Sequence, residues 1–151
     1  MKIESPAFHN NEPIPVLYTC DGKRTSPPLF FVDTPVAAKS FVLIMEDPDI
    51  PRSVRHDGVW DHWLIWNIPA KTDEVEEGKP PTGVYGTNSG GTKKYGPPCP
   101  PDREHRYFFK LFALDTVLSL PEGSNKEQLL AAIDGHVLDH AELIGTYDRK
   151  K

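Results

Sequence analysis

The stretch that decides the fold is Tyr95–Leu114, YGPPCPPDREHRYFFKLFAL. It begins with a loop that contains Pro97, Pro98, Pro100 and Pro101. Each proline fixes φ at about −65° and lacks a backbone N–H donor, so this loop is stiff. His105-Arg106-Tyr107 and an apolar run with strand character follow. A stiff loop that leads a histidine into a strand is typical of a site on a rigid scaffold, and a plain turn before an edge strand is the alternative.

The length and composition favour one globular domain over residues 1–151. The chain has 151 residues, 38% hydrophobic and 26% charged, which is typical of a folded domain with its own core. Proline is abundant, 16 residues, which favours loops and short strands over long helices. The net charge of −5 argues against general binding to nucleic acid or to an anionic membrane surface, although a local anion site is compatible with it.

The two cysteines, Cys20 and Cys99, are too few for a disulfide framework, and no C-x-x-C motif is present. We therefore expect both to be reduced thiols, with one bridge as the alternative. Residues 1–20 contain no apolar signal core, and no window approaches a membrane span. These features predict a soluble, cytoplasmic protein without stable membrane insertion.

Apolar and β-branched runs bounded by turn residues predict a mainly β fold of two packed sheets. Strands are expected over Ile14–Thr19, Ser26–Phe31, Ser40–Glu46, Val59–Pro69, Tyr107–Leu114 and Ala141–Tyr147, with an edge strand and loops over Ser5–Asn11. One short helix is expected from Asn125 to Ile133, with Ser124 as N-cap and Glu127 as its capping-box partner. Residues 71–94 are interpreted as a long surface loop.

Polar residues lie at the ends of three of these strands. Since alternate residues of a strand share a face, His62 is expected beside Trp60, Leu64 and Trp66. By the same rule, His105 shares a face with Tyr107 and Phe109, and Asp47 shares one with Leu43 and Met45. Each of these polar residues has a structural alternative. A histidine beside an aromatic ring packs in many cores, and an aspartate before proline often only forms a turn.

Two kinds of catalytic chemistry remain open at this point. Cys99 near His105 would make a thiol nucleophile, although no third group is evident to orient the histidine. Asp47, His62 and His105 have the composition of a two-histidine, one-carboxylate metal site, but no motif with metal-ligand spacing supports it.

Three motifs together resemble the phosphatidylethanolamine-binding protein (PEBP) family, also called the Raf kinase inhibitor protein family. They are D-P-D-x-P at residues 47–51, W-x-H at residues 60–62, and G-P-x-x-P at residues 96–100 followed by H-R-Y at residues 105–107. Their order and spacing agree with the family, and the resemblance covers residues 3–147. The chain has no long C-terminal helix of the eukaryotic type, which indicates the compact bacterial and archaeal branch.

The resemblance implies a two-sheet β-sandwich with one or two short peripheral helices and a small anion pocket at one end. The implied pocket residues are Asp47, Pro51, Trp60, His62, Gly96, Pro97, His105 and Tyr107. Phosphate-like anions, acetate and phosphorylated head groups are the implied ligands, and regulation of a kinase-like partner is the implied role. The resemblance also favours a cis Ile50–Pro51 bond. Asp61 departs from many relatives, which would make the pocket rim more acidic.

These residue types suit an anion. His62 and His105 donate hydrogen bonds most strongly when protonated, and the usual histidine pKa is about 6.5, so binding is expected to weaken as pH rises. Tyr107 adds a neutral donor, and Gly96 lets the backbone approach a ligand because it lacks Cβ. Asp47 fits as an acceptor that orients a histidine.

Three functions follow from this interpretation. The first is a non-enzymatic anion-binding protein with a regulatory protein partner, for which no cofactor and no metal are expected. The second is a hydrolase that uses Asp47, His62 and His105. The third is a protease-inhibitor-like protein that presents residues 71–94. The oligomeric state is open, and a homodimer is one option. For the first function, His62→Ala and His105→Ala are each predicted to abolish phosphate binding and to leave the fold intact.

Overall fold

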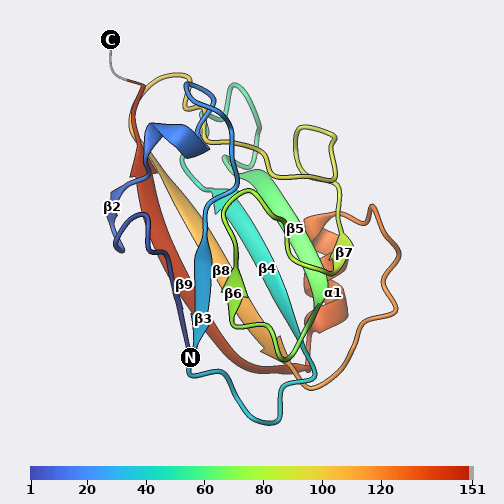
Figure 1. The fold of residues 1–151 in the computed structure, drawn as a ribbon. Helices are drawn as coiled ribbons and strands as arrows, with labels where there is room; N and C mark the ends of the chain where they lie inside the picture. Colours follow the sequence, from blue (N-terminus) through green and yellow to red (C-terminus); the bar gives the residue numbers. More distant parts are fainter. Residues whose placement is uncertain (150–151) are drawn as a thin grey trace.

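The chain folds into two β-sheets that pack face to face (Figure 1). The structure is a computed structural model that describes residues 1–149. Its strands are β1 (Lys2–Glu4), β2 (Glu12–Pro13), β3 (Leu29–Val32), β4 (Ser40–Asp47), β5 (Trp60–Pro69), β6 (Glu74–Val75), β7 (Val84–Tyr85), β8 (His105–Leu114) and β9 (Val137–Tyr147). The larger sheet has the order β2-β9-β8-β4-β5-β7, and the smaller has the order β1-β3-β6. The predicted mainly β, two-sheet class is confirmed.

Strand β4 is central because it pairs with β5 on one side and β8 on the other. Phe41, Leu43 and Met45 belong to the first core, which lies between the two sheets. Val42 and Ile44 belong to the second core, on the opposite face. That face is covered by the only α-helix of residues 1–149, α1 (Lys126–Ile133), through its buried Leu129 and Ile133. A strand that is buried on both faces explains the nearly continuous apolar sequence of β4.

A register shift in β5 changes which residues share a face. Met45 pairs with Trp63 and Glu46 pairs with Asp61, so His62 is an extra residue without a partner on β4. Such a bulge re-aims the side chains beyond it. The sequence predicted an unbroken alternation through this strand, and that prediction is wrong.

The consequence is that the expected face of β5 is divided. Leu64 and Trp66 lie in the second core, under the helix. Trp60 instead pairs with Asp47, and the His62 ring packs edge-on against Tyr107, a residue of the first core. The expected shared face of Tyr107 and Phe109 on β8 is present, since both lie in the first core.

The helix begins one residue later than expected. Asn125, not Ser124, is the N-cap, and it exchanges hydrogen bonds of 2.9 Å with Gln128, which takes the place predicted for Glu127. Asparagine and serine cap helices about equally well, so the sequence alone does not choose between neighbouring candidates.

The N-terminal segment contains less strand than expected. Within the predicted strand Ile14–Thr19, residues Val16–Tyr18 form a 3₁₀ turn in which the N–H of Tyr18 donates to the carbonyl of Pro15. Only Glu12 and Pro13 pair with β9 in this region. The next strand, β3, begins after Pro27 and Pro28, which have no N–H to donate to a sheet.

Residues 71–94 are not one free loop. β6 pairs with β3 of the smaller sheet, and β7 pairs with β5 of the larger sheet. The segment therefore crosses from one sheet to the other. Within residues 1–149, no helix is long and apolar enough to cross a bilayer.

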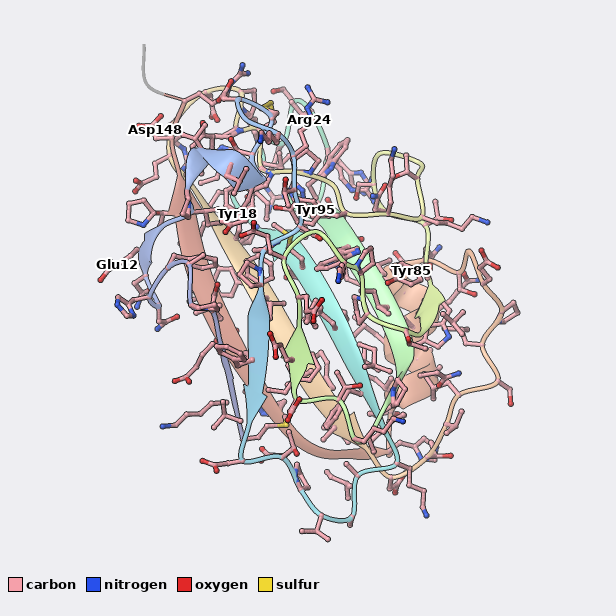
Figure 2. The ribbon with its side chains drawn as sticks, in the orientation of Figure 1. Glu12, Tyr18, Arg24, Tyr85, Tyr95 and Asp148 are labelled. Carbon is pink, nitrogen blue, oxygen red and sulfur yellow. A yellow bond between two sulfur atoms is a disulfide. The ribbon has the colours of Figure 1, made fainter. Side chains whose placement is uncertain are left out.

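Cys20 and Cys99 form a disulfide, so the prediction of two reduced thiols is wrong. The two residues are 79 apart in sequence, and the N–H of Cys20 also donates to the carbonyl of Pro98 at 3.1 Å. The bridge fastens the proline-rich loop to the N-terminal segment. Nearby, the hydroxyl of Tyr95 donates to the carbonyl of Tyr18 at 2.8 Å (Figure 2), which makes a second tie between the same two segments.

One end of the larger sheet gathers the three predicted motifs. β4 ends there, β5 and β8 begin there, and β9 finishes there (Figure 1). Asp47 pairs with Trp60 across β4 and β5, and His105 pairs with Tyr147 across β8 and β9. Strand ends far apart in sequence thus meet at one place.

Candidate functional site

A cavity of about 280 Å³ opens at this end of the sheet and is the candidate pocket. It is lined by Asp47, Ile50, Val54, Trp60, His62, Pro97, Cys99, Pro101 and Tyr107. Five of the eight predicted pocket residues are in this lining: Asp47, Trp60, His62, Pro97 and Tyr107. The other three are not in the lining: Pro51 and Gly96 are sequence neighbours of the lining residues Ile50 and Pro97, and His105 bonds to Asp47.

His62 is held by one ring nitrogen and has the other one free. Its Nδ1 lies 2.7 Å from the carbonyl oxygen of Gly96. A carbonyl only accepts hydrogen bonds, so Nδ1 carries the hydrogen. The side chain is 5% exposed, and its Nε2 has no hydrogen-bond partner among residues 1–149. A buried polar atom of this kind is a natural point of contact for a ligand.

Burial lowers the pKa of His62 to about 4. Desolvation is the largest cause, the nearby His105 acts in the same direction, and the bond to Gly96 opposes them. At neutral pH the ring is therefore uncharged, and Nε2 presents a lone pair. The expectation that His62 would titrate near pH 6.5 does not fit this burial.

Tyr107 supplies the second free polar group. Its side chain is fully buried, and its hydroxyl has no hydrogen-bond partner in the described part of the chain. Its ring lies 5.3 Å from that of His62, centroid to centroid. Burial raises the pKa of Tyr107 well above its usual value, so the hydroxyl stays protonated and able to donate.

Gly96 bonds to His62 and does not line the cavity. Its N–H donates to the carbonyl of His62 at 2.9 Å, while its own carbonyl accepts from the His62 ring. A Cβ at this position would lie 3.1 Å from the His62 carbonyl oxygen, which is closer than most such contacts. Glycine thus allows the loop backbone to approach the strand. The expected role, an approach of Gly96 to the ligand, is replaced by this one.

His105 is fully buried behind the lining and is bound on both sides by carboxylates. Its Nδ1 lies 2.6 Å from Asp47 Oδ2, and its Nε2 lies 2.7 Å from Asp102 Oδ1. The expected contact between Asp47 and a histidine is present, but both nitrogens of His105 are occupied. Burial raises the pKa of Asp47, and the hydrogen bond from His105 opposes that rise.

The loop after β4 turns without a cis proline. Asp47 Oδ1 accepts from the N–H of Asp49 at 2.7 Å, and the carbonyl of Pro51 accepts from the N–H groups of Val54 and Arg55. These bonds reverse the chain with every peptide of residues 1–149 in the trans form. The predicted cis Ile50–Pro51 bond is therefore wrong.

Asp61 does not make the pocket rim acidic. Its Oδ1 lies 2.6 Å from Lys126 Nζ, and Lys126 also lies 3.2 Å from Glu46 Oε1. Asp61 and Glu46 are paired on the helix face of the sheet, opposite the first core. Asp61 thus ties helix α1 to the sheet, and it is not in the pocket lining.

Comparison with known proteins agrees with the fold and the motifs. The family model described as phosphatidylethanolamine-binding protein matches residues 4–148. The chain belongs to the PEBP family.

Its relatives in the PEBP family include bacterial and archaeal proteins of similar length. A UPF0098 protein of Chlamydia trachomatis is 52% identical over 149 residues, 99% of each chain. A UPF0098 protein of Methanothermobacter thermautotrophicus is 48% identical over 155 residues, again 99% of each chain.

Two solved structures of the PEBP family match nearly the whole chain. A putative PEBP homolog from Chlamydia trachomatis superposes with a TM-score of 0.96 at 51% identity and covers 99% of this chain and 97% of its own. Escherichia coli YbcL, described as a new member of the mammalian PEBP family, superposes with a TM-score of 0.88 at 29% identity and covers 99% of this chain and 98% of its own.

In the PEBP-family pocket, the residues of the catalytic alternatives have other partners. Cys99 is in a disulfide, so it offers no thiolate to His105. The ring nitrogens of His105 face Asp47 and Asp102, and the bonded nitrogen of His62 faces Gly96. Among residues 1–149, no group of three or more histidine, cysteine, aspartate or glutamate side chains is arranged as a metal site.

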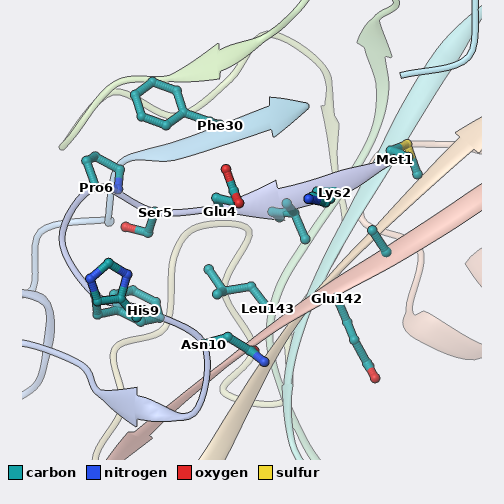
Figure 3. Close-up of a pocket in the computed structure, with 13 residues that line it drawn as sticks. Met1, Lys2, Glu4, Ser5, Pro6, His9, Asn10, Phe30, Glu142 and Leu143 are labelled. Atoms are coloured by element: carbon teal, nitrogen blue, oxygen red, sulfur yellow. The ribbon is translucent and has the colours of Figure 1, made fainter. Parts of the chain in front are cut away.

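A larger groove of about 600 Å³ lies elsewhere on the PEBP fold, between β1 and β9 (Figure 3). Glu4 and Lys2 lie on one side of it, and Glu142 and Leu143 lie on the other. None of the buried polar atoms that lack a partner among residues 1–149 belongs to its lining. We therefore place the candidate site in the smaller cavity.

Sequence reasoning missed several residues of the PEBP pocket. Ile50, Val54 and Pro101 line the cavity, and Asp102 holds His105 from outside. Asn88 is also buried, and its side-chain amide donates to the carbonyls of His62 and Lys94, which fixes the glycine-rich loop against β5. Asp102 could have been noticed from its place three residues before His105. The apolar residues carry no such signal.

Proposed function

We propose that the protein binds a small anion or phosphorylated group in the candidate pocket and that binding, not catalysis, is its activity. The observation that carries the proposal is a pair of buried polar atoms without a partner among residues 1–149, His62 Nε2 and Tyr107 Oη, on two residues that line a cavity of about 280 Å³. Membership of a family described as phosphatidylethanolamine-binding supports a ligand with a phosphate group.

The chemistry of the lining fits a small oxyanion. Tyr107 can donate to one oxygen, and Nε2 of His62 can accept from a second oxygen that carries a hydrogen. Ile50, Val54 and Trp60 provide apolar walls. Such walls exclude water and strengthen hydrogen bonds inside the cavity. The size suits a phosphate or acetate group, and the rest of a larger ligand would extend out of the pocket.

Titration of inorganic phosphate and acetate tests this function. Tyr107→Phe should weaken phosphate binding at least ~10-fold, because a hydrogen bond to a charged group contributes about 1.5–3 kcal/mol. His62→Asn should also weaken it, because the substitution removes Nε2 from the lining. His136→Asn is the matched control, since the His136 side chain forms an exposed ion pair with Asp115 and does not line the pocket. Unchanged affinity in both pocket variants, with thermal melts like that of the original protein, would refute the assignment.

The hydrolase alternative requires His62 to act as a base toward a nucleophile. Within the described residues, His62 has no carboxylate partner, because Asp47 bonds to His105 and Asp49. We expect no turnover of p-nitrophenyl phosphate or p-nitrophenyl acetate that depends on His62. Turnover that His62→Asn removes would favour the hydrolase.

The regulatory role is proposed to depend on ligand occupancy. Val54 lines the cavity and is also 55% exposed, so the segment around it connects the pocket with the outer surface. A bound anion would stabilise residues 50–58 and change the surface that a protein partner meets. Hydrogen exchange measured with and without phosphate tests this, and slower exchange over residues 50–58 is expected. Equal exchange rates would contradict a ligand-dependent surface.

A further inference from the structure

The hydrogen on His62 Nδ1 has a consequence for the ligand. Since Nδ1 donates to Gly96, the neutral ring can only accept at Nε2. A fully ionised phosphate oxygen also only accepts. The two would face each other as lone pairs, and the contact is unfavourable unless a hydrogen lies between them.

No lysine or arginine of the lining can bind the phosphate oxygen in place of a hydrogen on Nε2. The lining contains no lysine and no arginine. The titratable groups around the His62 ring are Asp47 of β4, Tyr107 of β8 and, behind them, His105 of β8. Cys99 of the loop is in the disulfide and does not titrate. Asp47 already accepts through both carboxylate oxygens, from Asp49 and His105.

We propose that the candidate pocket binds a phosphate monoester together with one proton from solvent, which lies between His62 Nε2 and a phosphate oxygen. The inference rests on the proposed function, because it concerns the same pocket and the same anion. The step makes and breaks no covalent bond other than the one to the added proton. A dianionic monoester and one proton enter, and the complex holds both.

The pH dependence follows from the ligand. The second ionisation of a phosphate monoester has a pKa of about 6. Below that value the monoester already carries the proton, and the affinity is nearly constant. Above it, the proton must come from water, so the affinity falls about tenfold for each pH unit. The buried ring does not supply the proton itself, because burial lowers the pKa of His62 to about 4.

The same reasoning separates two sources of phosphate. A monoester can bring its own proton, whereas a phosphodiester, as in a phospholipid head group, has no second ionisable proton. A diester therefore binds with a proton only if His62 itself becomes charged in the cavity, which its burial opposes. We expect the pocket to prefer the monoester.

Isothermal titration calorimetry tests the inference, with methyl phosphate and dimethyl phosphate as probes. Titrations at one pH in buffers of different ionisation enthalpy give the number of protons taken up. The expected uptake for methyl phosphate is about one proton at pH 8 and close to zero at pH 5. Dimethyl phosphate should bind at least ~10-fold more weakly at pH 7.5, because it has no ionisable proton to bring.

Two variants test whether the proton lies at His62. His62→Asn keeps an amide donor for the Gly96 carbonyl but removes Nε2, and it should abolish the proton uptake at pH 8. His136→Asn removes an exposed histidine and should leave the uptake unchanged. Thermal melts of both variants show whether the fold persists.

The outcomes separate this inference from the proposed function. Binding of methyl phosphate at pH 8 without proton uptake would overturn the inference and leave the anion site standing. Proton uptake that persists in His62→Asn would contradict the location of the proton at His62. Equal affinity for the diester would contradict the preference for a monoester. If methyl phosphate, dimethyl phosphate and inorganic phosphate all fail to bind, the proposed function is overturned, and this inference with it.

Discussion

Two histidines with similar sequence surroundings have different environments in the structure. His62 and His105 each lie near the start of an apolar strand, and the sequence predicted the same role for both. The structure distinguishes them by their ring nitrogens. His62 leaves Nε2 free beside the cavity, while both nitrogens of His105 are bound to carboxylates. The motifs locate both residues, but only the three-dimensional partners show which one can meet a ligand.

Replacing His105 tests this difference. His105→Ala should lower the free energy of unfolding by about 3–5 kcal/mol, because it leaves the buried carboxylate of Asp47 without its partner. His136→Ala, at an exposed histidine–aspartate pair, should cost no more than about 1 kcal/mol. Urea unfolding at pH 7 measures both changes.

This result would replace the expectation that His105→Ala leaves the fold intact. If the two variants unfold at the same urea concentration, His105 is not the buried support described here.

At the scale of elements, the long strands were predictable and their irregularities were not. β4 is a continuous apolar run because both of its faces are buried, and the sequence predicts it to within one residue. The bulge at His62 leaves no comparable signal, since a strand with one extra residue has the same composition as a regular strand. Alternation alone therefore wrongly places Leu64 and Trp66 on the face of His62, although Trp60 and His62 do line the same cavity.

The cap of helix α1 gives a test at the same scale. Asn125→Ala should destabilise the protein by about 1 kcal/mol, because the N–H of Gln128 loses its acceptor. Asn125→Asp keeps an acceptor oxygen at that place and should change the stability by no more than a few tenths of a kcal/mol. Thermal unfolding compares the two. An equal effect of both substitutions would show that the cap is not at Asn125.

For the whole molecule, the disulfide was the largest error of the sequence analysis. Two cysteines that lie 79 residues apart cannot be paired by spacing, and nothing local in the sequence shows that their segments meet. Cys99 lines the candidate pocket, so the bridge also joins the pocket wall to the N-terminal segment.

Removing the bridge should lower the stability of the whole molecule. Cys20→Ser with Cys99→Ser is expected to cost about 2–4 kcal/mol, because the unfolded chain is no longer closed into a long loop. Thermal unfolding with and without a reductant measures the effect on the original protein, and the double variant should not respond to the reductant. Two titratable thiols in the unreduced, denatured protein would contradict the bridge.

The order of strands in the larger sheet bears on how the protein is made. A ribosome releases the chain from its N-terminus, so β4 and β5 can pair as soon as residue 69 has emerged, while the other edge of β4 waits for β8. The second edge of β8 remains unpaired until β9 emerges. His105 pairs with Tyr147, which is the last residue of β9. The pocket end of the sheet is therefore completed late in translation, and until then β8 offers an open edge to other nascent chains.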